Sequence, residues 1–181
     1  MSTPRMDLEA YLQRVGLPAA VPPTPEGLAR VHAAQLTAIP FENLDIQLGR
    51  GIDLDPASVH GKLLGRRGGY CFECNLLLRD ALVAMGFDAE LAVGRVVLHP
   101  TADAEAAPVR ARTHAVVLVE FGDGARRLAD AGFGGPNPRE PVRLRPADAP
   151  AVRWDAAADP VHGWRIRDRH ARPEPLDLYT V

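Results

Sequence analysis

The sequence predicts an α+β fold, with a helical bundle in the N-terminal half followed by an antiparallel β-barrel or curled sheet. Up to Gly86, apolar residues recur at helical spacing, and beyond it they alternate with polar residues at the period of a strand. Prolines and glycines mark the points where one element ends and the next begins. We therefore expect two units, a helical one over residues 1–86 and a barrel over residues 87–181.

The expected helices of the first half have recognisable start signals. Asp7 carries an N-cap side chain ahead of the first apolar periodic segment. The pairs Thr24-Pro25 and Asp55-Pro56 each place an N-cap residue before a proline at the first helical position. The predicted helices cover residues 7–16, 25–39, 56–65 and 71–86.

The second half has the pattern of short strands separated by turns. The turn Gly122-Asp123-Gly124 predicts a hairpin between two strands. We expect the polar, alanine-rich residues 99–112 to form a loop, and the weak pattern of residues 146–158 to be a surface loop as well. The predicted strands cover residues 89–98, 113–121, 125–129, 141–145, 163–168 and 176–181.

The composition limits the classes of protein to consider. The chain has 181 residues, of which 46% are hydrophobic, and a net charge of −2, which is typical of a soluble globular protein and argues against general nucleic-acid binding. The N-terminus has no apolar segment of a signal peptide, and no apolar run approaches the length of a membrane span. Two cysteines do not make a secreted disulfide framework, so we expect a cytoplasmic protein without nucleic-acid or membrane partners.

Cys71 stands where the sequence would build a reactive thiol. It directly follows the pair Gly68-Gly69 and Tyr70, and a helical apolar pattern begins at the cysteine itself. Unpaired backbone N–H groups and the positive end of the helix dipole favour a thiolate in a first turn. The glycines allow a sharp turn and leave room beside the sulfur. The alternative is an inert cysteine of the core.

A base and an orienting acid are also present in the chain. His114 is the one histidine inside a clear strand pattern, and Asp130 ends the next short strand before a glycine-rich turn. A thiolate nucleophile needs a base, and Cys, His and Asp form a triad by geometry and not by sequence distance. The alternatives are a histidine that packs on a strand face and an aspartate that only forms a turn.

The motif that starts at Cys71 has two further interpretations. Cys71 and Cys74 form a CxxC at a helix start, which is also the arrangement of a dithiol redox site. The flanking residues are not thioredoxin-like, and no parallel βαβ pattern surrounds them. A zinc site needs two more ligands at ligand spacing, and the chain has no second CxxC and only scattered histidines. We therefore expect no bound metal.

Four segments, in this order along the chain, resemble the signature of the arylamine N-acetyltransferase family. The resemblance implies a cysteine-protease-like fold and a catalytic triad formed by Cys71, His114 and Asp130. The segments are Ile39-Pro40-Phe41-Glu42-Asn43-Leu44, Arg67-Gly68-Gly69-Tyr70-Cys71-Phe72-Glu73-Cys74-Asn75, Arg112-Thr113-His114 and Leu128-Ala129-Asp130-Ala131-Gly132-Phe133-Gly134-Gly135.

The family resemblance also implies a reaction. A protein of this kind moves an acetyl group from acetyl-CoA to the nitrogen of an arylamine or arylhydrazine, in ping-pong order, through an acetyl-cysteine. Acetyl-CoA is then a co-substrate, and no permanently bound cofactor is implied; an oligomer remains possible. An amide synthase of the same fold, which uses a carrier-bound acyl chain, is the alternative enzyme. A homologue without the lid, with mainly hydrolytic or no activity, is the third possibility.

Further residues receive roles from the resemblance alone. The resemblance implies that one group of residues binds the substrate. It implies that a second group supports the active site through a buried hydrogen-bond network. The substrate-binding residues are Phe41, Phe133 and Gly134. The supporting residues are Glu42, Arg66 and Glu73.

The family normally continues for another domain, a lid, beyond the point that corresponds to Val181. Here the usual third domain is expected to be absent. An open cleft would bury less of the donor and would expose an acyl intermediate to water. We accordingly expect this chain to bind acetyl-CoA weakly and to turn it over mainly to acetate.

Overall fold

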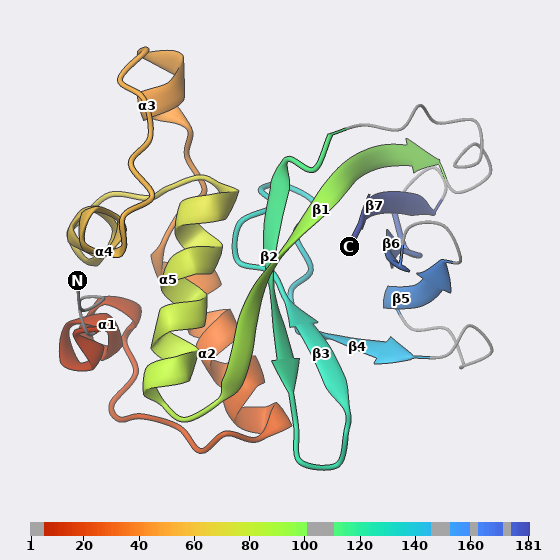
Figure 1. Cartoon of the computed structure of the whole chain (residues 1–181), viewed down its shortest axis with the longest axis horizontal. Helices are drawn as coiled ribbons and strands as arrows, with labels where there is room; N and C mark the ends of the chain where they lie inside the picture. The colour runs from red at the N-terminus through yellow and green to blue at the C-terminus, as the bar shows by residue number, and fades with distance from the viewer. Residues whose placement is uncertain (1–5, 101–110, 146–152, 160–162, 172–174) are drawn as a thin grey trace.

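The computed structural model describes residues 6–100, 111–145, 153–159, 163–171 and 175–181. In these ranges the chain forms a group of helices that lies against one side of a closed barrel (Figure 1). The helices are α1 (Leu8–Val15), α2 (Pro25–Ala38), α3 (Leu44–Gln47), α4 (Pro56–Leu64) and α5 (Cys71–Ala84). The strands are β1 (Asp88–Pro100), β2 (His114–Glu120), β3 (Arg126–Ala129), β4 (Val142–Arg145), β5 (Trp154–Asp159), β6 (Gly163–Asp168) and β7 (Leu176–Thr180).

The start signals of the helices are confirmed by their hydrogen bonds. The Asp7 carboxylate accepts from the backbone N–H of Ala10 at 3.0 Å at the start of α1. The Thr24 hydroxyl caps α2, and the Asp55 carboxylate caps α4. Gly16 ends α1 with φ +73°, a left-handed conformation that glycine adopts without steric cost. Local side-chain chemistry thus determines where these helices begin.

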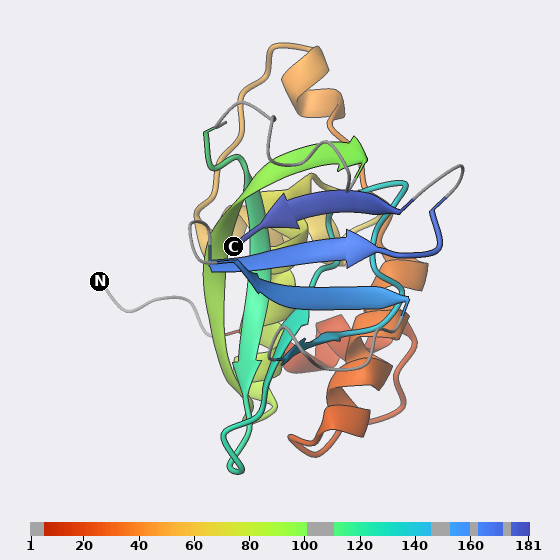
Figure 2. The ribbon, with the colours of Figure 1, turned by 90° about the vertical axis from the view of Figure 1, so that its right-hand side faces the viewer.

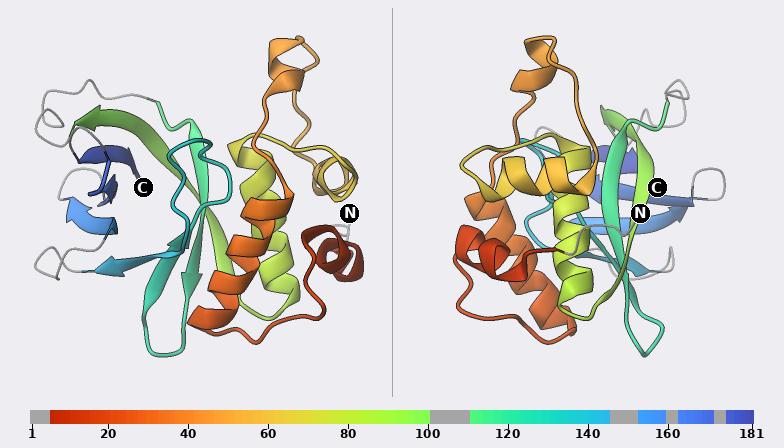
Figure 3. Two further views of the ribbon diagram at one scale, coloured as in Figure 1. Left: turned by 180° about the vertical axis from the view of Figure 1, so that it is seen from behind. Right: turned by 60° about the vertical axis from the view of Figure 1, so that its left-hand side comes forward.

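One helix was not predicted. Residues 44–47 form α3, which stands away from the other helices in each view of Figure 3. Its first turn is capped from outside the helix, because the Glu42 carboxylate accepts from the backbone N–H of Leu44 at 2.8 Å. A segment of this length is too short to produce a helical period in the sequence.

The barrel closes through β1, which pairs with β2 over its first half and with β7 over its second half. Figure 2 shows β5, β6 and β7 side by side on the face opposite the helices. Gly94 lies where β1 leaves β2, and a side chain there would collide with the backbone oxygen of Thr180. All neighbouring strands are antiparallel except β4 and β5, which are parallel. A tight hairpin cannot join parallel neighbours, and eight residues, 146–153, separate these two strands.

The prediction of a surface loop over residues 146–158 was wrong where the structure describes this segment. Residues 154–158 belong to β5, and residues 146–152 lie outside the described ranges. The segment Trp154-Asp155-Ala156-Ala157-Ala158 is poor in the β-branched residues that signal a strand. Pairing with β4 on one side and β6 on the other imposes the extended conformation. The predicted loop at residues 99–112 was also wrong at its start, because residues 99 and 100 belong to β1 and pair with β7. Residues 101–110 of that loop lie outside the described ranges.

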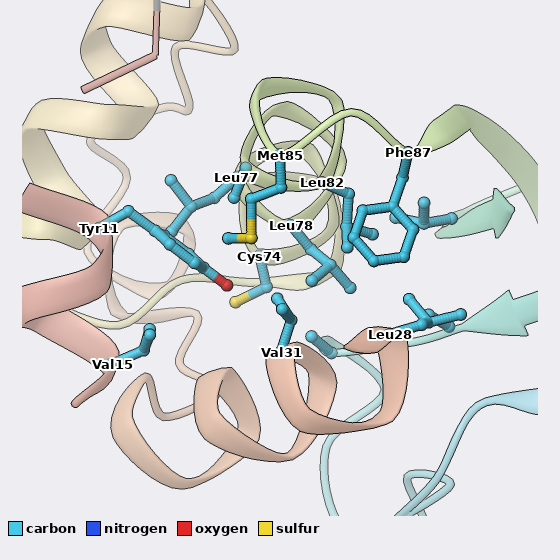
Figure 4. Packing of buried hydrophobic residues seen from close by; sticks show 14 of the residues in the cluster. Tyr11, Val15, Leu28, Val31, Cys74, Leu77, Leu78, Leu82, Met85 and Phe87 are labelled. Atoms are coloured by element: carbon cyan, nitrogen blue, oxygen red, sulfur yellow. The ribbon is translucent and has the colours of Figure 1, made fainter. Parts of the chain in front are cut away.

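The main apolar core lies between the helices and the barrel. Side chains of α1, α2 and α5 converge on it in Figure 4, where Tyr11, Val31 and Leu78 are labelled. The same cluster includes Val117 of β2 and Ala129 of β3, so it crosses the predicted boundary at Gly86. A second cluster fills the barrel itself. In the described part of the chain, no helix has the length and apolar character needed to cross a bilayer.

Candidate active site

The turn before Cys71 brings two distant segments together. Gly69 forms an isolated parallel bridge with Phe41, and its backbone N–H donates to the carbonyl of Pro40 at 3.3 Å. A Cβ at Gly69 would lie 2.9 Å from Cβ of Glu73, and a Cβ at Gly68 would collide with the Pro40 carbonyl. Glycine is therefore needed at both positions, because the turn packs too closely against Pro40 and Glu73 to leave room for a side chain. The turn places Cys71 at the first position of α5, where the sequence predicted it.

The register of the barrel brings His114 and Asp130 to one edge. His114 opens β2, and Asp130 follows the last residue of β3; β2 and β3 are antiparallel, with Val117 opposite Ala129. Nε2 of His114 lies 2.7 Å from Oδ2 of Asp130, and both residues are almost fully buried. The structure thus brings together the predicted base and the predicted orienting acid.

The electrostatics of this pair favour a charged histidine. Burial alone would lower the pKa of His114, but the charge of Asp130, the hydrogen bond to Asp130 and a hydrogen bond with Cys71 raise it to about 9. Burial would raise the pKa of Asp130, and His114 together with hydrogen bonds from Gly132 and Asn75 lowers it below its usual range. An imidazolium held between a carboxylate and a sulfur is the arrangement that supports a thiolate.

The carbonyl of Asp130 is held as firmly as its side chain. It accepts from Nδ2 of Asn137 at 2.6 Å and from Nε2 of His32 at 2.7 Å. His32 is fully buried; burial lowers its pKa, and the contact with Asp130 acts in the opposite direction. Asn137 also accepts from the backbone N–H of Phe133 at 2.7 Å, which closes the glycine-rich turn. Sequence reasoning assigned no role to either His32 or Asn137.

Cys74 has a different environment from Cys71. Its side chain is fully buried in the helical core, where Figure 4 labels it among apolar neighbours. Burial, with a smaller contribution from the charge of Glu73, raises the pKa of the Cys74 thiol to about 12. Its Sγ donates to the carbonyl of Gly69 at 3.2 Å. In contrast, Sγ of Cys71 lies 3.6 Å from the carbonyl of Thr113, beside His114.

The ion pairs beside the turn before Cys71 involve Arg67 in place of the predicted Arg66, and they are partly exposed, not buried. Arg67 donates to Oε1 of Glu42 at 2.7 Å and to Oδ2 of Asp45 at 3.1 Å. Arg66, the residue that the sequence analysis named, is exposed, and the structure gives it no ion pair among the described residues. Sequence pattern alone cannot distinguish two adjacent arginines ahead of a glycine turn, because the turn decides which side chain faces α3.

Lys62 connects these ion pairs to α5, the helix that begins with Cys71. Its Nζ lies 2.8 Å from Glu73 and 2.8 Å from Asp45. The second carboxylate oxygen of Glu73 accepts from the backbone N–H of Tyr70 at 3.1 Å, the residue before Cys71. Lys62 is the only lysine in the chain, which was the one signal in the sequence that singled it out.

The residues expected to bind substrate do not all lie in one pocket. A pocket of about 340 Å³ is lined by Phe41 and Gly134. Gly134 has φ +87°, and a side chain there would contact the Phe41 ring at 3.7 Å. Phe133 does not line this pocket; its ring packs against His114 at 4.9 Å and against Tyr179 at 4.9 Å between centroids. The other lining residues are Leu36, Ile39, Ala131, Gly135, Asn137 and Arg139.

Tyr179 is a neighbour of the triad that the sequence did not indicate. Its ring centroid lies 4.7 Å from that of His114, and the residue is fully buried on β7. Burial, and then the charge of Asp130, raises the pKa of its hydroxyl well above the usual value. Over the described ranges, no group of three or more histidine, cysteine, aspartate or glutamate side chains is arranged to hold a metal ion.

Comparison with known proteins decides the family. A family model described as N-acetyltransferase matches residues 24–156. The arylamine N-acetyltransferase / N-hydroxyarylamine O-acetyltransferase of Salmonella typhimurium is 44% identical over 140 residues, which cover 76% of this chain and 47% of the relative. The chain belongs to the arylamine N-acetyltransferase family. The resemblance based on the four motifs is thereby confirmed.

Solved structures of family members have the same fold. The Salmonella typhimurium enzyme matches with a TM-score of 0.82 and 37% identity, over 97% of this chain and 63% of that structure. The Mycobacterium marinum enzyme, solved in complex with CoA, matches with a TM-score of 0.83 and 34% identity, over 96% of this chain and 64% of that structure. The predicted fold class is confirmed. The chain spans about half to two thirds of the length of these relatives.

Proposed function

We propose that this chain carries the catalytic centre of an arylamine N-acetyltransferase. The proposal rests on one arrangement: Cys71, in the first turn of α5, hydrogen-bonds with His114, and His114 hydrogen-bonds with Asp130. Membership of the family supports acetyl-CoA as the acyl donor and an arylamine or arylhydrazine as the acceptor. Both cysteines are free thiols, which a reducing compartment preserves, and the cytoplasm is accordingly the proposed location.

The first half-reaction makes an acetyl-cysteine. The Cys71 thiolate attacks the thioester carbonyl carbon of acetyl-CoA, a new C–S bond forms, and the bond to the CoA sulfur breaks. His114, protonated in the resting ion pair, gives its proton to the departing CoA thiolate. Asp130 holds the imidazole by its hydrogen bond to Nε2, and the same imidazole hydrogen-bonds with Cys71.

The second half-reaction reverses these roles. The amine nitrogen attacks the acetyl-cysteine carbonyl, and the now neutral His114 accepts the proton that the nitrogen loses. The C–S bond breaks, Cys71 leaves as a thiolate, and the amide product carries the acetyl group. CoA leaves before the amine reacts, which is ping-pong order.

The acceptor is proposed to bind beside the glycine-rich turn. Phe41, exposed over 45% of its surface, offers a flat aromatic wall, and Gly134 lies against its ring. Phe133 contacts His114 directly and so lies where an amine must approach the base. Aromatic faces of this kind suit an aromatic amine. The network of Glu42, Arg67 and Glu73 is proposed to hold this wall and α5 in place.

The direct test is the mass of the intact protein after addition of acetyl-CoA. The expected result is an increase by one acetyl group, which Cys71→Ser abolishes and Cys74→Ser retains. Addition of an arylamine should then restore the original mass and yield the acetylated amine. A carrier-bound acyl chain that labels Cys71, where acetyl-CoA does not, would favour the amide synthase instead. No labelling by either donor would count against the proposal.

A further inference from the structure

Asn75, on α5 with Cys71, contacts the two other segments that carry the proposed triad. It follows Cys71 by four residues on α5, which places both side chains on one face of the helix, one turn apart. Helix α5 packs against β2, and Figure 1 shows the two elements side by side. The side chain of Asn75 is fully buried. A buried amide must find hydrogen-bond partners, and its partners define what it does.

Each polar atom of Asn75 contacts a different part of the site. Its Nδ2 donates to the carbonyl of Ala115, next to His114, at 2.7 Å, and to Oδ1 of Asp130 at 3.0 Å. Its Oδ1 accepts from the backbone N–H of Ala131 at 2.9 Å. The orientation of the amide is fixed by these partners, because a carbonyl only accepts and a backbone N–H only donates.

These bonds determine how the Asp130 carboxylate is turned. Its Oδ1 is occupied by Asn75 and by the backbone N–H of Gly132 at 2.9 Å. Its Oδ2 is thereby left for His114. The turn that carries Asp130 also lies close to α5. A Cβ at Gly132 would lie 2.7 Å from Cα of Cys71 and 3.0 Å from Nδ2 of Asn75.

We propose that Asn75 is a positioning residue for the Cys71–His114 pair. By fixing one oxygen of Asp130, it directs the other oxygen to His114, which stabilises the imidazolium and therefore the Cys71 thiolate. The inference rests on the proposed roles of the triad but not on the identity of the acyl donor or of the acceptor. Asn75 acts through Asp130 and is not proposed to contact the substrate or the sulfur.

The test measures alkylation of Cys71 by iodoacetamide against pH, in a Cys74→Ser background that leaves one thiol. Asn75→Ala is expected to lower the rate at pH 6 by about tenfold or more, because a hydrogen bond to a charged group is lost. At pH 9.5 a free thiol ionises without help, and the rate is expected to stay within about twofold of wild type.

Gln35→Ala is the matched control. Gln35 is an equally buried amide that also contacts α5, since it donates to the carbonyl of Cys74 at 2.8 Å and accepts from the Tyr11 hydroxyl at 2.9 Å. It touches no triad residue, so its loss should lower thermal stability and leave the pH profile unchanged. If Gln35→Ala moves the profile as much as Asn75→Ala, the effect is structural and the inference fails.

A double-mutant cycle tests the path through Asp130. In an Asp130→Asn background, Asn75→Ala should change the rate at pH 6 no further. An additional decrease would overturn the inference, and so would a wild-type profile for Asn75→Ala. Should Asn75→Ala not fold, Asn75→Ser replaces it, because its hydroxyl is too short to span three partners. A wild-type chain that alkylates rapidly at pH 6 but is not acetylated would count against the proposed function alone.

Discussion

Oδ2 of Asp130 lies 2.7 Å from Nε2 of His114, and the two side chains are almost completely buried. A carboxylate and an imidazole at this distance, removed from water, favour the charged form of both. A hydrogen bond with Cys71 also helps to hold the pKa of His114 above its usual value. We therefore expect the reactivity of Cys71 to depend on His114 and Asp130 as much as on the helix to which Cys71 belongs.

The two cysteines are expected to behave differently on substitution. Cys71→Ser should abolish acetyl transfer, because a serine hydroxyl is not ionised by a histidine ion pair as a thiol is. Cys74→Ser should keep much of the activity, since Cys74 is a fully buried core residue whose raised pKa keeps it protonated. The comparison is made on acetyl-amine formation at equal protein concentration. Equal losses would point to the dithiol mechanism.

The ion pair predicts a shifted alkylation profile. A free cysteine ionises near pH 8.5, whereas a thiolate paired with imidazolium persists at lower pH. Because the pKa of His114 is raised to about 9, Cys71 should react rapidly with iodoacetamide near pH 6. His114→Ala should move the profile upward, toward that of a free thiol. A wild-type profile with a single step near 8.5 would exclude the ion pair.

Stability should depend on pH through His114. Its pKa in the folded chain, about 9, lies above the ordinary value of 6.5, so the charged form stabilises the folded state. This contribution is complete below about pH 6.5 and is lost as the pH rises through about 9. The difference in Tm between wild type and His114→Gln should accordingly shrink between these pH values. A difference that grew over this range would contradict the raised pKa.

The sequence revealed features that depend on neighbouring residues better than features that depend on tertiary contacts. The helix starts at Asp7, Thr24 and Asp55 were predicted because the cap and its partner lie within three residues of each other. Cys71 was predicted for a similar reason, since the glycine pair and the helix pattern adjoin it. His114 and Asp130 were predicted to be partners from their order along the chain and their residue types. The pairing of β2 with β3 in the barrel explains why they are in contact.

What the sequence did not predict depends on long-range pairing. The strand β5 forms because β4 and β6 flank an alanine-rich segment. Tyr179 reaches His114 only when β7 closes the barrel on β1. His32 reaches the carbonyl of Asp130 across 98 residues of sequence. No local pattern encodes contacts of this kind, although the four-residue spacing of Asn75 from Cys71 was a usable signal.

Arg67 and Arg66 form a natural pair of test and control. Arg67→Ala removes the contacts to Glu42 and Asp45 and should lower Tm by a few degrees, with a larger KM for the acceptor because Phe41 adjoins Glu42. Arg66→Ala removes an exposed side chain without an ion pair in the described structure, and both quantities should stay close to wild type. Thermal unfolding and initial rates at varied amine concentration provide the measurements. A larger effect from Arg66→Ala would restore the original assignment.

Gly132 controls how closely the turn that carries Asp130 approaches Cys71. A Cβ at this position would lie 2.7 Å from Cα of Cys71, so Gly132→Ala must push the turn away from α5. Overpacking of this kind costs about 1–3 kcal/mol of stability. The same displacement lengthens the bond from Asp130 to His114, and we expect at least a tenfold loss of Cys71 acetylation, since misplacement by about 1 Å can cost 100-fold.

The control for this substitution lies in the same turn. A Cβ at Gly135 has no atom within 4 Å, so Gly135→Ala should fold like the wild-type chain and be acetylated by acetyl-CoA at the wild-type rate, although Gly135 lines the pocket beside Phe41. Acetylation is followed by intact mass and stability by thermal unfolding. If Gly132→Ala lost stability but kept the full acetylation rate, the distance between the turn and α5 would not govern the chemistry. If both alanine variants lost activity equally, flexibility of the glycine-rich turn, and not its close approach to Cys71, would be the property that the reaction requires.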